Sequence, residues 1–290
     1  MIENPLDIGG AVAFWTPAEF TDRTRLAAGL APLGLEEYVP GPRPAASLLR
    51  DALEDALGGP RVLVRPLADR DGYTVIREER GRAGNAYTTA LVARVGSIGS
   101  VGGDDPPRLA FDPPDERAAL VEAAFARHSG RIPAAQLSLA LVRIVERFGG
   151  TRLKPTGAIY WIPGPKLDDW AAVAGAVEGA AVGRPSAVYL LRHRLDADAV
   201  RAIRDAVVAD VRGEVERIRA EVVSGELGGR ALEGRRRRAV ELRHKVLLYE
   251  DVLSVALRDL HAAVDGADQA AATAALLLGA ESQGASTASR

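Results

Sequence analysis

The stretch TRLKPTGAIYWIPG, residues 151–164, consists of two short segments rich in β-forming residues joined by a Pro-Thr-Gly sequence. Pro155 and Gly157 suit positions i+1 and i+3 of a type I turn, so the stretch predicts a β-hairpin. Its second arm has Tyr, Trp and Ile in succession at 160–162. Because side chains of a strand alternate between its two faces, this arm presents bulk on both faces. The pattern favours a strand buried between two layers over an exposed wing.

The segment before the hairpin leaves a second interpretation open. Residues 112–163 can be aligned with the order of a winged helix-turn-helix, with 139–148 as the recognition helix and the hairpin as the wing. Residues 133–148 contain no glycine to mark an internal turn, and one unbroken helix accounts for the same span. In either arrangement, four cations of this region are candidates for contact with a phosphate backbone: Arg143, Arg147, Arg152 and Lys154.

The composition is typical of a globular protein from a GC-rich bacterial genome. Hydrophobic residues make up 47% of the 290 residues, and all but three of the 37 cations are arginine. Since arginine is the default cation of such a chain, arginine runs indicate phosphate binding less strongly than they would elsewhere. The absence of cysteine excludes disulfides, thiolate zinc sites and cysteine nucleophiles. With an acidic residue where a secretory signal requires positive charge, and no apolar run near ~20 residues, the sequence predicts a cytoplasmic protein without membrane contact.

Residues 1–111 are predicted to form one α+β domain with an antiparallel sheet. A short strand at 11–15 precedes a helix, and Thr-Pro-Ala-Glu at 16–19 matches a capping box at the start of that helix. A second helix is expected at 44–57. The segments that follow have the two-residue period of strands and short turn-forming links, which favours an antiparallel meander: 61–68, 72–79, 85–95 and 108–111.

Residues 112–195 are predicted to form a smaller unit of helix, helix, β-hairpin, helix and strand. In residues 196–278 two long amphipathic helices are expected, and apolar residues of the second recur at alternating spacings of three and four. Such a heptad seam predicts an antiparallel helical hairpin. Residues 279–290 are small and polar and are expected to be disordered. The fold class is therefore α+β: N-terminal helices with an antiparallel β-meander, a second small α/β unit containing a β-hairpin, and a long C-terminal antiparallel helical hairpin.

The second helix of that hairpin begins with a strongly basic stretch. Residues 230–245 contain seven cations and two acids. Four consecutive arginines within it cover all sides of a helix and are candidates for binding phosphates or an acidic partner: Arg235, Arg236, Arg237 and Arg238. The alternative is that they solvate the helix and pair with acids on its neighbour, such as Glu214, Glu216 and Glu221.

No motif indicates catalysis, a cofactor or a metal ion. The glycine-rich segment 96–107 lacks the Gly-Lys-Ser/Thr ending of a P-loop and places two aspartates where an anion would bind, so it is interpreted as a connector. Glu241 and His244 have the spacing of metal ligands, but a di-iron bundle needs two such pairs and two further glutamates. The heptad seam places Leu242 in the core, so Glu241 and His244 are expected on the surface.

The sequence favours a binding protein over an enzyme. The first hypothesis is a non-enzymatic nucleic-acid-binding or assembly protein that uses its arginine-rich surfaces. The second is a structural or adaptor subunit that self-assembles or docks a partner protein through the seam residues Leu242, Val246, Tyr249 and Leu253. The third is an enzyme whose active site is assembled from residues distant in sequence. The expected partners are nucleic acid, a second copy of the chain or another protein, and no cofactor is expected.

Overall fold

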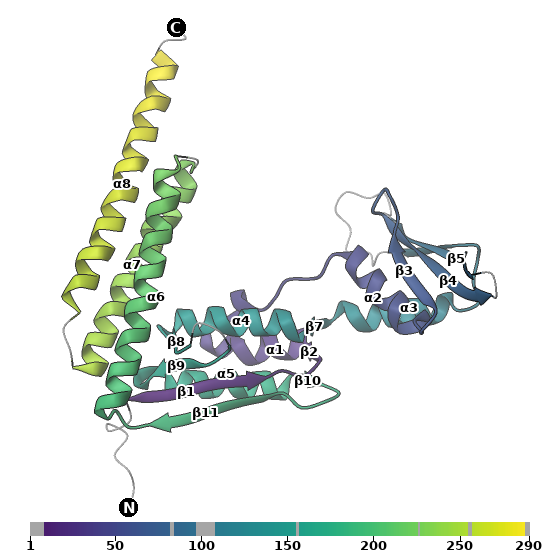
Figure 1. Ribbon diagram of the computed structural model, residues 1–290, viewed down its shortest axis with the longest axis horizontal. Coiled ribbons are helices and arrows are strands. Elements are labelled where there is room, and N and C mark those ends of the chain that lie inside the picture. The colour runs from purple at the N-terminus through teal and green to yellow at the C-terminus, as the bar shows by residue number, and fades with distance from the viewer. Residues whose placement is uncertain are drawn as a thin grey trace, which may run out of the picture.

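The computed structural model describes residues 9–81, 84–96, 108–154, 157–225, 227–254 and 257–287 of the chain. They form three parts, each with its own hydrophobic core: a central body, an outer lobe and a C-terminal bundle. The body lies horizontally in Figure 1, with the outer lobe at its right end and the bundle rising from its left end. The mixed α+β class predicted from the sequence is confirmed.

The central body is built on two antiparallel sheets, of strand order β11-β1-β9-β8 and β10-β2-β7. The strands of the larger sheet are β1 Gly10–Thr16, β8 Thr151–Arg152, β9 Tyr160–Pro163 and β11 Ala187–His193. Those of the smaller sheet are β2 Phe20–Asp22, β7 Arg131–Pro133 and β10 Ala181–Val182. The helical segments of the body are α1 Arg23–Leu30, η2 Ala31–Leu33, η3 Glu36–Tyr38, α4 Ala134–Arg147, η4 Gly164–Lys166 and α5 Leu167–Gly179.

The outer lobe is a four-stranded sheet packed against two helices. Its elements are α2 Ala45–Leu57, β3 Val62–Pro66, β4 Gly72–Gly81, β5 Gly84–Gly96, β6 Arg108–Asp112 and α3 Ala118–Ser129. The strands pair in sequence order, so the predicted antiparallel meander is confirmed. Leu53 of α2 and Val121 of α3 are fully buried in a core shared with Leu91 of β5. The glycine-rich connector predicted at 96–107 lies outside the described residues from 97 onward.

The C-terminal bundle consists of α6 Ala197–Val223, α7 Gly229–Leu253 and α8 Arg258–Thr287. Helix α6 begins where the sequence predicts, because the Asp196 side chain accepts a hydrogen bond from the Ala199 backbone N–H at 2.7 Å. The predicted helical hairpin of α6 and α7 is present, and the buried valines Val207 and Val246 belong to the same core. In the described residues no helix is long and apolar enough to cross a membrane.

A third helix follows where the sequence predicts a continuation of the second. Helix α7 ends at Leu253, Ser254 takes a left-handed conformation, and α8 then packs against both α6 and α7. The heptad spacing continues across this break, since Leu260 and Val264 of α8 are buried in the bundle core. The spacing alone therefore did not reveal the turn. Helix α8 also includes residues 279–287, which were expected to be disordered, and 288–290 lie outside the described residues.

Strand β9 lies between two of the cores, as its Tyr-Trp-Ile sequence predicts. Tyr160 and Ile162 are buried against the helices of the body, whereas Trp161 is buried in the core of the bundle. Side chains on opposite faces of β9 therefore pack into the core of the body and into the core of the bundle. The predicted hairpin is confirmed by the antiparallel pairing of β8 with β9, and its turn residues 155 and 156 lie outside the described residues.

Residues 134–147 form a single helix, which removes the winged helix-turn-helix alternative. Leu137, Leu141 and Ile144 of α4 are buried in the core of the body. The segment predicted as a recognition helix, 139–148, is therefore not a separate helix: its residues up to Arg147 are the second part of α4, which is packed in the core along one side. With bulky side chains of β9 buried on both faces, the hairpin does not project as a wing.

The domain boundaries predicted at 111 and 195 differ from the observed cores. Strand β1 is hydrogen-bonded to β9 on one side and to β11 on the other, so the start of the chain belongs with residues 131–193. Residues 45–129 form the outer lobe with a core of their own. These boundaries could not be predicted from the sequence, because the pairing of β1 with β9 and β11 joins strands that are far apart in the chain.

The start of the first helix also differs from the prediction. Thr16 is the last residue of β1, and the chain forms β2 before α1 begins at Arg23. The cap of α1 is Asp22, whose side chain accepts a hydrogen bond from the Arg25 backbone N–H at 2.9 Å. The capping-box sequence at 16–19 is therefore used as a strand end and a turn.

Candidate functional site

The four seam residues predicted as a protein interface are used within the chain. They are at most 5% exposed and belong to the core formed with α6 and α8: Leu242, Val246, Tyr249 and Leu253. Burial raises the pKa of the Tyr249 hydroxyl well above its ordinary value, and the charge of Asp210 acts in the same direction. This side of α7 is thus closed to a partner, and the interface predicted at these residues is corrected to an intramolecular core.

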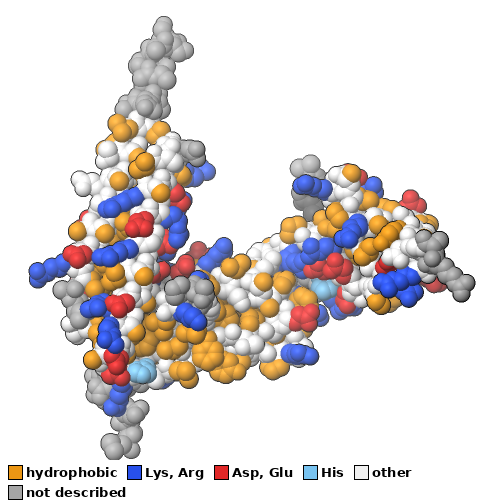
Figure 2. Space-filling model, viewed as in Figure 1, with side chains coloured by type: hydrophobic (Ala, Val, Ile, Leu, Met, Phe, Trp, Pro, Cys, Tyr) orange, Lys and Arg blue, Asp and Glu red, His pale blue; other side chains and the backbone are white. Residues whose placement is uncertain are grey.

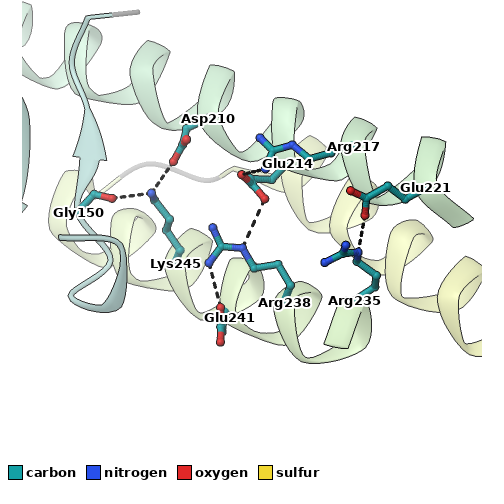
Figure 3. A network of polar contacts seen from close by, with 9 residues as sticks. All are labelled: Gly150, Asp210, Glu214, Arg217, Glu221, Arg235, Arg238, Glu241 and Lys245. Carbon is teal, nitrogen blue, oxygen red and sulfur yellow. Dashed lines mark hydrogen bonds and ion pairs between the residues drawn. The ribbon is translucent and has the colours of Figure 1, made fainter. Parts of the chain in front are cut away.

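Two of the four consecutive arginines pair with acids of α6, as the alternative interpretation expects. Arg235 forms an ion pair with Glu221, and Arg238 Nε lies 3.5 Å from Glu214 Oε2 (Figure 3). The earlier residue of α7, Arg235, pairs with the later acid of α6, Glu221, and the later residue, Arg238, pairs with the earlier acid, Glu214. The two helices are therefore antiparallel. The third acid considered, Glu216, is exposed and has no ion-pair partner among the described residues.

The other two consecutive arginines differ from one another. Arg236 Nε lies 3.6 Å from Asp268 Oδ1 of α8, whereas Arg237 is exposed and no described residue pairs with it. A further cation of the basic stretch, Arg243, contacts Asp265 of α8 at 2.7 Å. Figure 2 shows cationic and acidic side chains interspersed along the bundle. Most of the basic stretch therefore stabilises the packing of the three helices.

Lys245 joins the bundle to the central body. Its Nζ donates hydrogen bonds to the Gly150 carbonyl at 2.7 Å and to Asp210 Oδ2 at 2.6 Å, and its side chain is only 10% exposed (Figure 3). The Thr151 hydroxyl also donates to Asp210 at 3.3 Å. Gly149, with φ of 71°, precedes these contacts, and a Cβ there would lie 2.9 Å from Leu248 of α7. The loop after α4 is thus held closely against α7.

Replacing Lys245 by methionine is expected to lower the free energy of unfolding by about 1–3 kcal/mol, because the buried Gly150 carbonyl loses its charged donor. Urea denaturation followed by tryptophan fluorescence measures the change. Lys166→Met is the matched control, since its Asp169 partner at 2.9 Å and its 42% exposure describe a surface pair worth little. Equal losses in the two variants would contradict the role of Lys245.

A cleft of about 350 Å³ lies where the C-terminal end of α4 meets the middle of α7, and we call it the α4/α7 cleft. The 3₁₀ segments η3 and η4 complete its wall with Tyr38 and Lys166. Phe148, Leu242 and Leu248 form the apolar part of its lining. Its charged lining consists of five cations and two carboxylates: Arg143, Arg147, Lys166, Arg238, Lys245, Glu146 and Glu241.

Two of these cations are free to bind a ligand. Arg143 and Arg147 are one turn apart on α4, both are exposed, and neither has an ion-pair partner among the described residues. The carboxylate of Glu146, on the same turn, is likewise exposed and has no ion-pair partner among the described residues. The remaining cations of the cleft are already paired with acids. Two arginines against one carboxylate, all without ion-pair partners among the described residues, leave the α4/α7 cleft with a net positive charge.

The electrostatic environment favours the protonated form of two donors in the cleft, Arg238 and Tyr38. Burial opposes the charged form of Arg238, but its hydrogen bond to Glu241 and the charge of Glu214 outweigh this, so its pKa is raised above the ordinary value. Burial also raises the pKa of the Tyr38 hydroxyl, with a smaller contribution from the charge of Glu37. At neutral pH both groups are hydrogen-bond donors.

The other cations predicted from the hairpin lie apart from this cleft. Arg152 donates a hydrogen bond to the Tyr160 hydroxyl at 3.0 Å and lines a neighbouring cleft between β8 and α6. Lys154 is exposed and has no described partner. The α4/α7 cleft thus brings together Arg143, Arg147 and Arg238, which are separated in sequence. The sequence does not predict Tyr38 and Lys166 as site residues, because they are single residues outside any charge run.

The pair considered for a metal site is on the surface. Glu241 and His244 are both exposed, and Glu241 accepts a hydrogen bond from Arg238 at 2.9 Å. Among the residues that the structure describes, no group of three or more His, Asp or Glu side chains is arranged to hold a metal ion. The α4/α7 cleft thus presents arginine side chains without acidic partners among the described residues, beside apolar and aromatic side chains.

Comparison of the chain with curated proteins and with solved structures found no match. One family model matches nearly all of it, from residue 7 to residue 282, and so spans the body, the outer lobe and the bundle. The chain therefore belongs to the family of unknown function DUF6744.

Proposed function

We propose that this protein is a non-enzymatic nucleic-acid-binding protein whose α4/α7 cleft contacts the phosphate backbone. The observation that supports this most directly is the pair Arg143 and Arg147, exposed on one turn of α4 without an acidic partner in the described residues. A guanidinium that has no carboxylate partner is available for bidentate contact with a phosphate. Arginines already paired within the bundle would have to break an ion pair first.

The cleft adds two features that support a phosphate site. Lys166 and Arg238 on its walls increase the positive potential around the two free arginines, although each also has an acidic partner. A recess with an excess of positive charge attracts polyanions from solution, and cations outnumber carboxylates in this lining. The exposed Arg237 on α7 lines an adjoining recess that shares Glu146, Arg238 and Glu241 with the α4/α7 cleft, so a further arginine without an ion-pair partner among the described residues lies next to the cleft.

The charge-reversal double variant Arg143→Glu/Arg147→Glu is expected to bind DNA about tenfold or more weakly than the wild type at ~50 mM salt. Its plot of log affinity against log salt should be shallower by about 2, because two phosphate contacts are lost. Fluorescence anisotropy with labelled short DNA and RNA strands measures both quantities. The variant should unfold at the wild-type temperature, since both side chains are exposed.

The matched control is Arg184→Glu/Arg212→Glu. These arginines are exposed, have no ion-pair partner among the described residues, lie outside the cleft and produce the same change in net charge. Equal weakening by the two double variants would show that overall charge, and not the α4/α7 cleft, determines binding. Absence of affinity for DNA and RNA at low salt would refute the proposed function.

A further inference from the structure

The α4/α7 cleft contains more than a phosphate site requires. Beside the free arginines it has the half-buried Leu248 and the aromatic ring of Tyr38, whereas Phe148 and Leu242 line it with side chains that are only 7% and 3% exposed. Phosphates are fully solvated polar groups and gain nothing from such a surface. A nucleobase, in contrast, has an apolar face that stacks on aromatic rings and packs against apolar side chains. The lining is therefore suited to a base together with its phosphate.

The unpartnered carboxylate of Glu146 supports the same conclusion. It lies in the cleft on the same turn of α4 as Arg143 and Arg147 and has no ion-pair partner among the described residues, although its charge contributes to the raised pKa of Arg238. A carboxylate at this position repels phosphates, so it weakens a site that binds only phosphate. It accepts hydrogen bonds from the exocyclic amino groups of cytosine and adenine, which are donors.

The shape of the site distinguishes a single strand from a duplex. Proteins that read a duplex insert a helix or a strand into a groove. Here the exposed cations of α4, Arg143 and Arg147, border a recess of about 350 Å³ between α4 and α7. A recess of this size is within the range of pockets that hold small organic ligands. Only a base that is not stacked inside a duplex can enter it.

We propose that the α4/α7 cleft is selective for single-stranded nucleic acid and accommodates one base against Tyr38 and the apolar lining, with Arg143 and Arg147 on the adjacent phosphates. Side chains one turn apart on a helix are about 5–6 Å apart at Cβ, so both arginines can reach phosphates next to the same nucleotide. The Glu146 carboxylate then accepts a hydrogen bond from the amino group of the base. This inference rests on the proposed function and specifies its ligand.

The first arm of the test compares a short labelled DNA strand with its duplex by fluorescence anisotropy. The single strand is expected to bind at least about tenfold more tightly, and Tyr38→Ala to weaken its binding about tenfold through loss of stacking. Tyr38→Phe keeps the ring and should bind nearly as the wild type does. Tyr87→Ala, at a tyrosine of the outer lobe that is 59% exposed, is the control and should have no effect.

The second arm does not depend on any variant. Cytidine 5′-monophosphate and inorganic phosphate are compared as competitors of the labelled strand, and the nucleotide should compete at a lower concentration because its base enters the cleft. Equal competition by the two, or equal affinity for strand and duplex, would overturn single-strand selectivity and leave the proposed function standing. Absence of binding to both strand and duplex at low salt would overturn the two proposals together.

Discussion

Replacement of Trp161 by alanine is expected to lower the free energy of unfolding by about 3–5 kcal/mol, the range found for removal of large buried aromatic side chains. Trp161 is 2% exposed and lies in the core of the bundle, although it belongs to a strand of the central body. Its indole Nε1 makes no hydrogen bond with the described residues, so the loss is one of packing. Urea denaturation monitored by circular dichroism measures it.

The control for this variant is Tyr87→Ala, which removes a large aromatic side chain that is 59% exposed on the outer lobe. This change should stay within about 0.5 kcal/mol of the wild type. If Trp161→Ala had an equally small effect, the strand would not be buried between the body and the bundle as described.

Replacement of Val246 by aspartate is expected to have the second large effect, an unfolding of the C-terminal bundle. Val246 is fully buried among apolar side chains of α6 and α8, and an unpaired carboxylate there costs about 3–5 kcal/mol or more. Helical circular dichroism should decrease and the thermal midpoint should fall by many degrees. The result is expected in a dilute monomeric sample, because the seam is closed within one chain.

The adjacent substitution Leu247→Asp is the matched control, since Leu247 is 50% exposed on the same turn of α7. It places the same charge on the same helix and should leave helix content unchanged. A Val246→Asp protein that kept its helix content and thermal midpoint, but lost self-association, would show that the seam joins separate chains after all.

Local features of this fold could be predicted well from the sequence. The Tyr-Trp-Ile sequence of β9 predicted burial on both faces, and the two-residue period predicted the meander of the outer lobe. These patterns are set by neighbouring residues. The assignment of β1 to the same sheet as β11 could not be predicted, because pairing of distant strands leaves no local pattern. The turn after Leu253 was missed for the opposite reason, since the seam repeats on both sides of it.

The candidate site was predictable only in part. Sequence reasoning identified Arg143 and Arg147 as cations that could reach a phosphate, and both line the α4/α7 cleft. The sequence left open whether Arg235 and Arg238 are paired, because Glu221 and Glu214, which contact them, lie on another helix. Whether a charged side chain has an ion-pair partner depends on the residues that lie near it in the folded structure, and the sequence does not show which residues these are.

The position of β1 has a consequence for the order in which the chain folds during synthesis. β1 is translated before both of its neighbouring strands, β9 and β11, and the whole outer lobe is translated between β1 and these two strands. The outer lobe contains all of its own strand pairings, so it can fold as soon as it leaves the ribosome. Until β9 and β11 have been translated, both edges of β1 lack a partner strand of the large sheet. A chaperone that shields exposed strands would therefore assist the central body far more than the outer lobe.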